Sequence, residues 1–302
     1  MIDIAIIGGG PAGLTAGLYA ARSGRSCVLF EEIFVGGQAA KTHIIENYPG
    51  FADGVQGSTL GLNMEQQAVK FGLEIRYDPV EKLELKGGVK RVITKKNTTE
   101  ARAVIIATGA EPRKLGLPGE ERLTGAGVSY CATCDGAFFK GRDVAVIGGG
   151  DTAISDALYL TKFVKKVFVI HRRDELRASE VLQKATFSDP KIEFIWDSIP
   201  KEFMGEEKLS GLLTENVKTK EQKRIDVDAV FIAVGIEPKS NLVKDILKLT
   251  PEGYIKTDCI MQTSEKGVYA AGDVRDTPLR QVVTAVADGA IAATKAVEYL
   301  SV

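Results

Sequence analysis

Short runs of apolar residues recur along the chain, and two of them pass into glycine and then into a helical pattern. The first run, residues 3–7, leads into a glycine-rich segment at 8–13, a helical stretch at 14–23 and a second apolar run, Cys27–Glu31. The same order returns at 143–147, 148–153, 154–163 and 167–170. Continuous apolar runs are typical of strands buried on both faces, and strands that alternate with helices predict parallel α/β units.

A second internal echo predicts how these units are arranged along the chain. The apolar runs 103–107 and 229–234 are followed by Glu111-Pro112 and Glu237-Pro238, where proline interrupts regular structure. We therefore expect one α/β domain to be inserted into another, with crossings at these two points. The outer domain comprises residues 1–111 and 241–302, and the inner domain comprises residues 112–240. The outer domain also takes in a strand at 267–273 that ends in Gly-Asp and a helical stretch that reaches residue 299.

The first glycine-rich segment has the surroundings of a dinucleotide-binding turn. Gly8-Gly9-Gly10-Pro11-Ala12-Gly13 lies between a strand and a helix, and Glu31 follows Gly10 by 21 residues at the end of the next strand. The glycines allow a pyrophosphate to approach the backbone, and the acid hydrogen-bonds a free ribose 2′-hydroxyl. A glycine-rich turn without a ligand is the alternative. The predicted binding residues are Gly8, Gly10, Pro11, Ala12, Gly13 and Glu31.

The second glycine-rich segment predicts a different nucleotide. The position 21 residues after Gly150 is His171, followed by Arg172-Arg173, with Arg177 close behind and no carboxylate at the ribose position. Guanidinium groups bind a 2′-phosphate, which an acid would repel, so we expect NADPH here. The alternative is a solvated basic turn. The predicted residues are Gly149, Gly150, Asp151, Thr152, Ala153, His171, Arg172, Arg173, Arg177 and Gly235.

Composition narrows the possible classes of protein. The 302 residues include 39 Lys and Arg against 40 Asp and Glu, which argues against a nucleic-acid-binding protein. The apolar fraction of 44% and the charged fraction of 26% are those of an ordinary globular chain, whereas 32 glycines are more than usual. No apolar run approaches a membrane span, and the N-terminus lacks the pattern of a signal peptide. We therefore expect a cytoplasmic protein that does not bind membranes or nucleic acids.

The sequence Cys131-Ala132-Thr133-Cys134-Asp135 is the strongest candidate for chemistry. A zinc site needs two further ligands, but Cys27 and Cys259 are far away in sequence and the two histidines are His43 and His171. Haem attachment needs a histidine where Asp135 stands. Two unpaired structural cysteines are a further alternative. A redox pair fits best, because close thiols in a reducing compartment undergo disulfide exchange and Asp135 can move the proton that this exchange requires. We expect no metal.

Over essentially its whole length the sequence resembles the low-molecular-weight, bacterial-type thioredoxin reductases, which are class II pyridine nucleotide-disulfide oxidoreductases. The resemblance rests on the two glycine-rich turns and on further motifs, the most specific being Cys-Ala-Thr-Cys-Asp-Gly within the second nucleotide domain. The other matching segments are 36–38, 46–50, 107–109, 171–174, 177–178, 271–273 and 280–281. Each of these alone is less specific.

The resemblance implies an α/β fold with two Rossmann-like, three-layer domains, the NADPH domain being inserted into a discontinuous FAD domain. It implies that FAD binds the first turn, and that Cys134 faces the flavin while Cys131 attacks the disulfide of thioredoxin or a related dithiol protein. Asp135 is the acid–base group, the crossings near Glu111 and Glu237 form a hinge, and the protein is a homodimer. The further residues that it implies at FAD are Glu32, Gly36, Gly37, Gln38, Asn47, Thr108, Gly109, Gly272, Asp273, Arg280, Gln281 and Val282.

Three alternatives remain open at this point. In the first alternative, the enzyme accepts electrons from both NADH and NADPH. In another, the same scaffold acts as a dithiol oxidase or an oxygen-reducing NAD(P)H oxidase. In the third, the protein is a nucleotide-binding redox sensor without turnover. The acceptor is thioredoxin, a glutaredoxin-like protein or a small disulfide.

Overall fold

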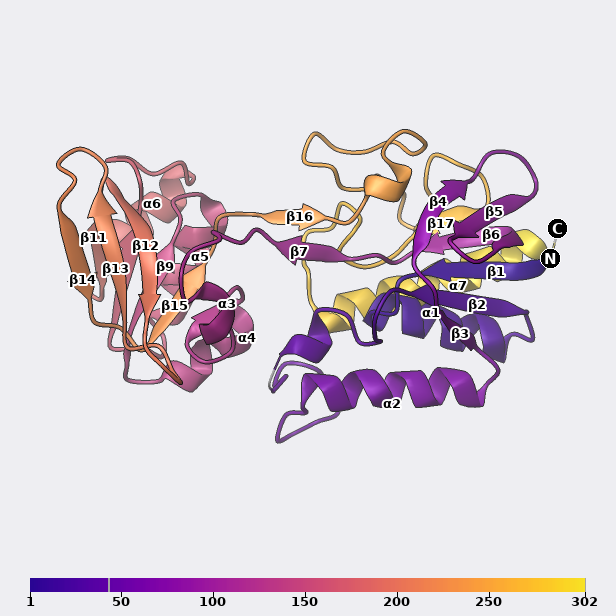
Figure 1. Cartoon of the computed structure of the whole chain (residues 1–302), viewed down its shortest axis with the longest axis horizontal. Coiled ribbons are helices and arrows are strands. Elements are labelled where there is room, and N and C mark those ends of the chain that lie inside the picture. The colour runs from indigo at the N-terminus through magenta and orange to yellow at the C-terminus, as the bar shows by residue number, and fades with distance from the viewer. Residues whose placement is uncertain (43, 302) are drawn as a thin grey trace. The chain divides into compact units, whose positions relative to one another are not determined.

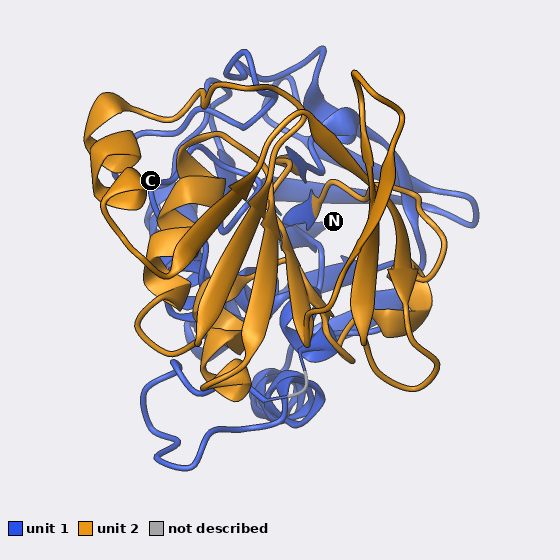
Figure 2. Cartoon of the chain, turned by 90° about the vertical axis from the view of Figure 1, so that its left-hand side faces the viewer, with its two compact units in different colours: residues 1–111, 237–302 blue, residues 112–236 orange. Residues whose placement is uncertain are grey.

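The computed structural model describes residues 1–42 and 44–301, and its chain divides into two compact units. Unit 1 contains Met1–Glu111 and Glu237–Val302, and unit 2 contains Pro112–Ile236, so unit 2 lies within unit 1 in sequence (Figure 2). The unit boundary after Ile236 differs from the expected boundary after residue 240. Within the described residues, no helix is long and apolar enough to cross a membrane.

Unit 1 is built on a sheet whose strand order is β3-β2-β1-β6-β5-β4, with β17 also paired to β6. Strands β1, β2, β3, β6 and β17 pair in parallel, whereas β4 and β5 form an antiparallel extension. The strands are β1 (Ile2–Ile7), β2 (Cys27–Glu31), β3 (Glu74–Tyr77), β4 (Val80–Glu84), β5 (Lys90–Thr94), β6 (Thr98–Ile106) and β17 (Val268–Ala270). The helices are α1 (Pro11–Arg22), α2 (Gly57–Lys70) and α7 (Val282–Leu300), with short 3₁₀ turns η1 (Ala39–Lys41) and η3 (Asn241–Val243) (Figure 1).

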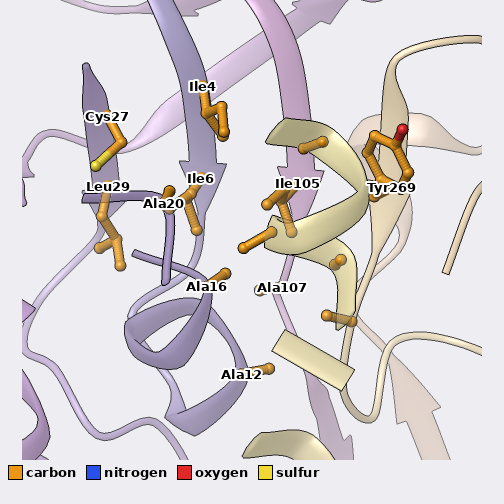
Figure 3. Packing of buried hydrophobic residues seen from close by; sticks show 14 of the residues in the cluster. Ile4, Ile6, Ala12, Ala16, Ala20, Cys27, Leu29, Ile105, Ala107 and Tyr269 are labelled. Carbon is orange, nitrogen blue, oxygen red and sulfur yellow. The ribbon is translucent and has the colours of Figure 1, made fainter. Parts of the chain in front are cut away.

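Both faces of the unit 1 sheet are buried, as the unbroken apolar runs predict. Ile4 and Ile6 of β1 point to the face covered by α1 and α7, whereas Ala5 and Ile7 point to the opposite face, because successive side chains of a strand alternate. Small residues such as Ala12 and Ala16 of α1 (Figure 3) and Ala292 of α7 let the two helices lie close to the sheet and to each other. This packing fixes the ends of β1 and α1, between which the first glycine-rich turn lies.

Unit 2 repeats the plan with a fully parallel sheet in the order β11-β10-β9-β15-β8. A three-stranded antiparallel sheet, β12-β13-β14, adds a second layer of strands. The parallel strands are β8 (Val128–Ser129), β9 (Asp143–Ile147), β10 (Lys166–Ile170), β11 (Ile192–Ile195) and β15 (Ala229–Ile232); the antiparallel strands are β12 (Ser198–Met204), β13 (Gly211–Asn216) and β14 (Gln222–Ile225). The helices are α3 (Glu120–Leu123), α4 (Ala132–Asp135), α5 (Asp151–Leu160) and α6 (Glu180–Phe187), with the 3₁₀ turn η2 (Gly136–Phe139).

The two crossings pair with each other. Strands β7 (Ala110–Pro112) and β16 (Ile236–Pro238) form a two-stranded ribbon at the passage from one unit to the other (Figure 1). Each strand contains the Glu-Pro pair that marks the expected domain crossing. Both sheets with their covering helices agree with the predicted α/β class and its Rossmann-like domains.

Candidate functional site

The first glycine-rich turn joins β1 to α1 in a tight, open-sided bend. Gly8 has a φ of +106°, and a Cβ atom there would overlap the carbonyl oxygen of Ala107. A Cβ atom at Gly13 would overlap the carbonyl oxygen of Gly8, so the helix can approach the strand only because this residue is glycine. Gly10, by contrast, has room around it, because the nearest atom to a Cβ added there would be the Gly37 Cα at 4.0 Å.

The N-terminus of α1 is available to an anion. Gly10 is its N-cap and supplies no side-chain hydrogen bond, and the first turn contains no acidic residue. The first backbone N–H groups of a helix have no partner within the helix and carry the positive end of its dipole. Pro11 has no N–H group to offer, so Ala12 and Gly13 are the first donors that face an incoming phosphate group.

Glu31 lies at the end of β2 with its carboxylate turned back toward the glycine turn. Its Oε2 accepts a hydrogen bond from the Gly9 N–H at 2.7 Å, and its Oε1 accepts from the N–H groups of Glu32 and Ile33 at 2.8 and 3.1 Å. Glu32, the next residue, is exposed. The backbone of Gly36 donates to the Gly9 carbonyl at 2.7 Å, which holds the segment Gly36-Gly37-Gln38 beside the same turn.

Two other segments of unit 1 meet at the start of α7. Asn47 donates a hydrogen bond from Nδ2 to Oε1 of Gln281 at 2.9 Å. The Gln281 side chain in turn caps α7, which begins at Val282, and Thr284 returns the contact to the backbone of Gln281. Two residues that are 234 positions apart and that the sequence assigned to one site therefore lie in direct contact.

The loop after β17 carries a partly buried carboxyl group, Asp273, and a partly buried arginine, Arg280. Burial raises the pKa of Asp273 to about 6, against the lowering influence of Arg280. Arg280 stacks on the Tyr254 ring, with 4.2 Å from its guanidinium carbon to the ring centroid. Its buried Nε has no hydrogen-bond partner within the described residues, so this donor is free to bind a ligand.

Thr108 and Gly109, which also belong to the expected FAD site, contact the returning chain. The Thr108 hydroxyl donates to the Lys239 carbonyl at 2.6 Å, and the Lys239 N–H donates to the Gly109 carbonyl at 2.9 Å. Gly109 has a φ of +72°. These contacts fix the place where β6 passes into the ribbon.

The second glycine-rich turn, in unit 2, joins β9 to α5. Gly150 is the N-cap of α5 and supplies no side-chain bond, and a Cβ atom there would meet nothing within 4 Å. Asp151 accepts the Ser179 N–H at 2.7 Å, so its carboxylate is used to hold the following loop, while Thr152 is exposed and Ala153 is buried. Gly235 is exposed, with open space around its α-carbon and its carbonyl bonded to the Arg113 N–H.

His171 and the arginines that follow it occupy different environments. The His171 ring covers Gly149, where a Cβ atom would overlap it, and only 5% of the residue is exposed. Burial, with Arg177, Arg173 and Arg172 nearby, lowers the pKa of His171. The histidine is therefore a neutral packing group beneath the turn, whereas the three arginines are exposed, and no ion pair engages them within the described residues.

Two carboxylates near these arginines form ion pairs with a single lysine. Lys218, in the turn between β13 and β14, contacts Asp174 at 3.1 Å and Asp197 at 2.9 Å. Its hydrogen bonds hold the pKa of Asp174 below its usual value. The acid of the His-Arg-Arg-Asp motif is therefore turned toward Lys218 rather than toward the arginines that precede it.

The two cysteines of the redox motif form a disulfide at the start of α4. Cys131 is the N-cap of this helix, and its Cα lies 5.3 Å from that of Cys134. In this structure the two sulfurs are bonded to each other. Of the other two cysteines, Cys259 is exposed, whereas Cys27 is buried and its pKa is raised to about 11 by burial. His43, named as a possible zinc ligand, lies outside the described residues.

Asp135 ends α4 and is partly buried. Burial raises the pKa of its carboxyl group, and a hydrogen bond from Ser129 lowers it. The Ser129 hydroxyl lies 2.6 Å from Oδ2 of Asp135. A carboxyl group with a raised pKa next to a disulfide holds a proton more readily than an ordinary aspartate and can pass it on.

Comparison with known proteins agrees with this geometry. The family model described as pyridine nucleotide-disulphide oxidoreductase matches residues 2–289. The chain belongs to this family. A thioredoxin reductase from Streptomyces coelicolor is 48% identical over 302 residues, covering 99% of this chain and 94% of the relative. The predicted resemblance is thereby confirmed.

The fold of this pyridine nucleotide-disulphide oxidoreductase is similar to that of solved thioredoxin reductases. A thioredoxin reductase from Streptococcus pyogenes has a TM-score of 0.95 and 50% identity, covering 100% of this chain and 98% of that one. A thioredoxin reductase from Giardia duodenalis has a TM-score of 0.93 and 37% identity, covering 100% and 99%. The predicted fold class is confirmed by these likenesses.

Three residues of this oxidoreductase support the loop that carries Asp273 and Arg280, although sequence reasoning missed them. Asp288 of α7 accepts the Gly272 N–H at 3.1 Å and forms a bidentate ion pair with Arg275. Tyr254 supports Arg280 from another loop. A lone carboxylate in the alanine-rich segment 282–293 was the available signal for Asp288. Nothing local marks Arg275 or Tyr254, whose roles depend on contacts between distant segments.

Proposed function

We propose that the chain is an NADPH-dependent flavoprotein that reduces the disulfide of thioredoxin or a related small dithiol protein. The observation that carries this proposal is the Cys131–Cys134 disulfide within a unit that also holds a dinucleotide-type turn. The names of the relatives support thioredoxin as the acceptor. The homodimer and the cytoplasmic location belong to the proposal through the family resemblance and the reducing conditions that such chemistry requires.

The residues of unit 1 fit FAD. The uncapped N-terminus of α1 suits a pyrophosphate, and Glu31 lies where a ribose hydroxyl needs an acceptor. Arg280 offers a buried Nε without a partner in the described part of the chain, and Asp273 lies close enough to it to be affected by its charge. Gly36, Gly37, Gln38, Asn47, Thr108, Gly109, Gln281 and Val282 complete the proposed FAD site.

The residues of unit 2 fit NADPH. The uncapped N-terminus of α5 and the open side of Gly150 suit a second pyrophosphate. Arg172, Arg173 and Arg177 are exposed cations that bind a 2′-phosphate by charge-assisted hydrogen bonds. His171 supports this site from below as a packing group, and Asp151 orders the loop that carries Ser179.

When bound, FAD supplies a two-electron link between NADPH and a disulfide. Two electrons and two protons convert the Cys131–Cys134 disulfide into a dithiol, and the Cys131 thiol then loses its proton to solvent to become the attacking thiolate. The Cys131 sulfur attacks the acceptor disulfide, and Asp135 gives a proton to the sulfur that leaves. Cys134 attacks the resulting mixed disulfide, so the acceptor departs as a dithiol and the enzyme disulfide forms again.

The proposal also gives the β7–β16 ribbon a role. The residues that would hold NADPH and the Cys131–Cys134 pair are both in unit 2, whereas the residues that would hold FAD are in unit 1. Both the nicotinamide and the disulfide would need access to the same flavin. Two groups cannot occupy one position at the same time, so the ribbon serves as the hinge that lets them alternate.

Stopped-flow kinetics with a Cys134→Ser variant tests the proposal. NADPH should still bleach the flavin of this variant, whereas thioredoxin reduction should fall below detection because the redox pair is gone. Cys259→Ser removes an exposed, unpaired cysteine and should behave as the wild type. Persistent thioredoxin reduction by Cys134→Ser contradicts the assignment. If oxygen consumption is the same with and without thioredoxin, the protein is an oxidase. If the wild type turns over no dithiol acceptor, the protein is a sensor.

A further inference from the structure

Ser129 connects the attacking cysteine to the acid–base carboxyl group. It ends β8, is 5% exposed, and precedes Cys131 by two residues. Its Oγ accepts a hydrogen bond from the Cys131 N–H at 3.1 Å and lies 2.6 Å from Oδ2 of Asp135. One hydroxyl group therefore contacts both ends of the redox helix.

The direction of these hydrogen bonds is fixed by the chemistry of the hydroxyl group. A serine has a single O–H donor, and an N–H group can only donate, so the Cys131 amide occupies an acceptor position on Oγ. The hydroxyl proton has two acceptors within reach, the Asp135 carboxylate at 2.6 Å and the Cys131 carbonyl at 3.4 Å. The shorter contact and the charge of the carboxylate direct the proton to Asp135.

No other hydrogen-bond donor contacts the Asp135 side chain within the described residues. We propose that Ser129 is a positioning residue of the thiol–disulfide exchange, whose hydroxyl group holds the Asp135 carboxyl in register with the Cys131–Cys134 pair. This inference rests on the proposed function, because it assigns Ser129 a part in that reaction. It adds a residue that lies outside the Cys-Ala-Thr-Cys-Asp motif.

The surroundings of Asp135 determine how its titration is interpreted. The turn η2 and strand β8 contribute no titratable side chain, whereas α5, which packs against α4, carries Asp151 at its start and Asp156 and Tyr159 further along. Gly136 faces Leu160 and Tyr159 of α5, with 2.8 Å from an added Cβ atom to the nearest Leu160 atom. Asp156 lies one helical turn before Leu160, and burial raises its pKa to about 6. The experiment has to separate its titration from that of Asp135.

The sign of the expected change follows from the donated bond. Donation by Ser129 stabilises the ionised carboxylate, so its loss leaves burial unopposed and raises the pKa of Asp135 further. An acid works only while it holds its proton. The fall in kcat at high pH should therefore move to higher pH in Ser129→Ala, while the loss of orientation lowers kcat throughout the range.

The first measurement is kcat against pH with oxidised thioredoxin as the acceptor. The second is a titration of the Asp135 carboxyl in the oxidised holoenzyme by difference infrared spectroscopy, in which the Asp135 band is identified by its loss in Asp135→Asn. In Ser129→Ala we expect an about tenfold lower kcat and an about tenfold weaker proton dissociation at Asp135, with flavin reduction by NADPH unchanged. Ser129→Thr keeps a hydroxyl group and should restore both values. Ser240→Ala, which removes an equally buried hydroxyl bonded to the Gly253 carbonyl, should match the wild type.

Several outcomes overturn the inference without touching the proposed function. A wild-type infrared titration of Asp135 in Ser129→Ala does so, and so does a Ser129→Thr variant that behaves like the alanine variant. Asp156→Asn should leave the assigned carboxyl band in place; if the band disappears, the titrating group is Asp156 and the inference is wrong. In this experiment the proposed function itself fails if the wild type and Ser240→Ala reduce no dithiol acceptor.

Discussion

Two carboxyl groups of this chain are held in surroundings that oppose their charge. Asp156 and Asp273 both have their pKa raised to about 6, and burial is the largest cause for each. Asp273 has Arg280 nearby to offset part of this cost. For Asp156, burial is the single cause, so its ionisation at neutral pH is a net cost to the fold.

The position of Asp156 leads to a prediction about stability and pH. Its folded pKa of about 6 lies above the ordinary value of 3.8, so the folded state holds more protons than the unfolded state between these values. The free energy of unfolding therefore falls as the pH rises through about 4 to 6. Asp156→Asn should remove this fall and add about 2–3 kcal/mol at pH 8, with no gain at pH 4.

Denaturant unfolding at a series of pH values measures this effect. Asp53→Asn, which changes an exposed carboxyl group, is the matched control and should leave the dependence on pH as in the wild type. An Asp156→Asn variant that is less stable than the wild type at pH 8 would show that the carboxylate has a favourable partner, contrary to the prediction.

At the scale of elements, the contact between α1 and α7 decides the shape of the first nucleotide turn. Gly289 of α7 faces Ala12 of α1, and a Cβ atom at Gly289 would overlap the Ala12 carbonyl oxygen. Ala12 is also the second residue of the helix whose N-terminus faces the proposed FAD pyrophosphate. A change in the spacing of the two helices therefore alters the binding site as well as the core.

Gly289→Ala should consequently both destabilise unit 1 and weaken FAD binding. Backbone atoms cannot rotate away as a side chain can, so the helices have to separate, at a cost of about 1–3 kcal/mol. Gly88→Ala is the control, because a Cβ atom there meets nothing within 4 Å and its φ is not positive. Thermal unfolding and fluorescence titration of the apoprotein with FAD measure the two effects. If Gly289→Ala is destabilised but binds FAD with wild-type affinity, the spacing of the two helices affects the core without affecting the FAD site, which contradicts the prediction.

Local patterns predicted the elements that surround both glycine turns, because each signal lies within about 30 residues. The register of Gly10 with Glu31 and of Gly150 with Arg172 is of this kind. His171 shows the limit of such reasoning: its position matches the phosphate-binding register, yet its ring covers Gly149. A linear spacing gives the strand end at which a residue lies, but it does not give the direction of the side chain.

Contacts between distant segments could not be predicted in this way. The Lys218 pairing with Asp174 and Asp197 and the contact of Asp288 in α7 with Arg275 join residues whose partners depend on the tertiary fold. Ser129 precedes the redox motif by only two residues, but its bond to Asp135 depends on how α4 turns back toward β8. Contacts that depend on the tertiary fold in this way leave no local pattern in a single sequence from which they could be predicted.

At the scale of the whole molecule, each unit has a hydrophobic core of its own. The clusters around β1 and β6 consist of unit 1 residues, and those around β9 and β15 consist of unit 2 residues. A ligand that binds the folded form of one unit stabilises that unit by mass action, by about 2.7 kcal/mol at 100 times its dissociation constant. FAD and NADP⁺ should therefore act on different unfolding transitions.

Differential scanning calorimetry of the apoprotein tests this separation. FAD should raise the transition temperature of unit 1, and NADP⁺ that of unit 2. Replacing Arg172 and Arg173 with Ala should abolish the NADP⁺ shift, keep the FAD shift, and raise the KM for NADPH tens-fold with little change for NADH, since each charge-assisted bond contributes about 1.5–3 kcal/mol. Arg142→Ala, which removes another exposed arginine of unit 2, should retain the NADP⁺ shift. A single transition that both ligands move equally would contradict independent units, whereas an undiminished NADP⁺ shift in the double variant would contradict the phosphate site alone.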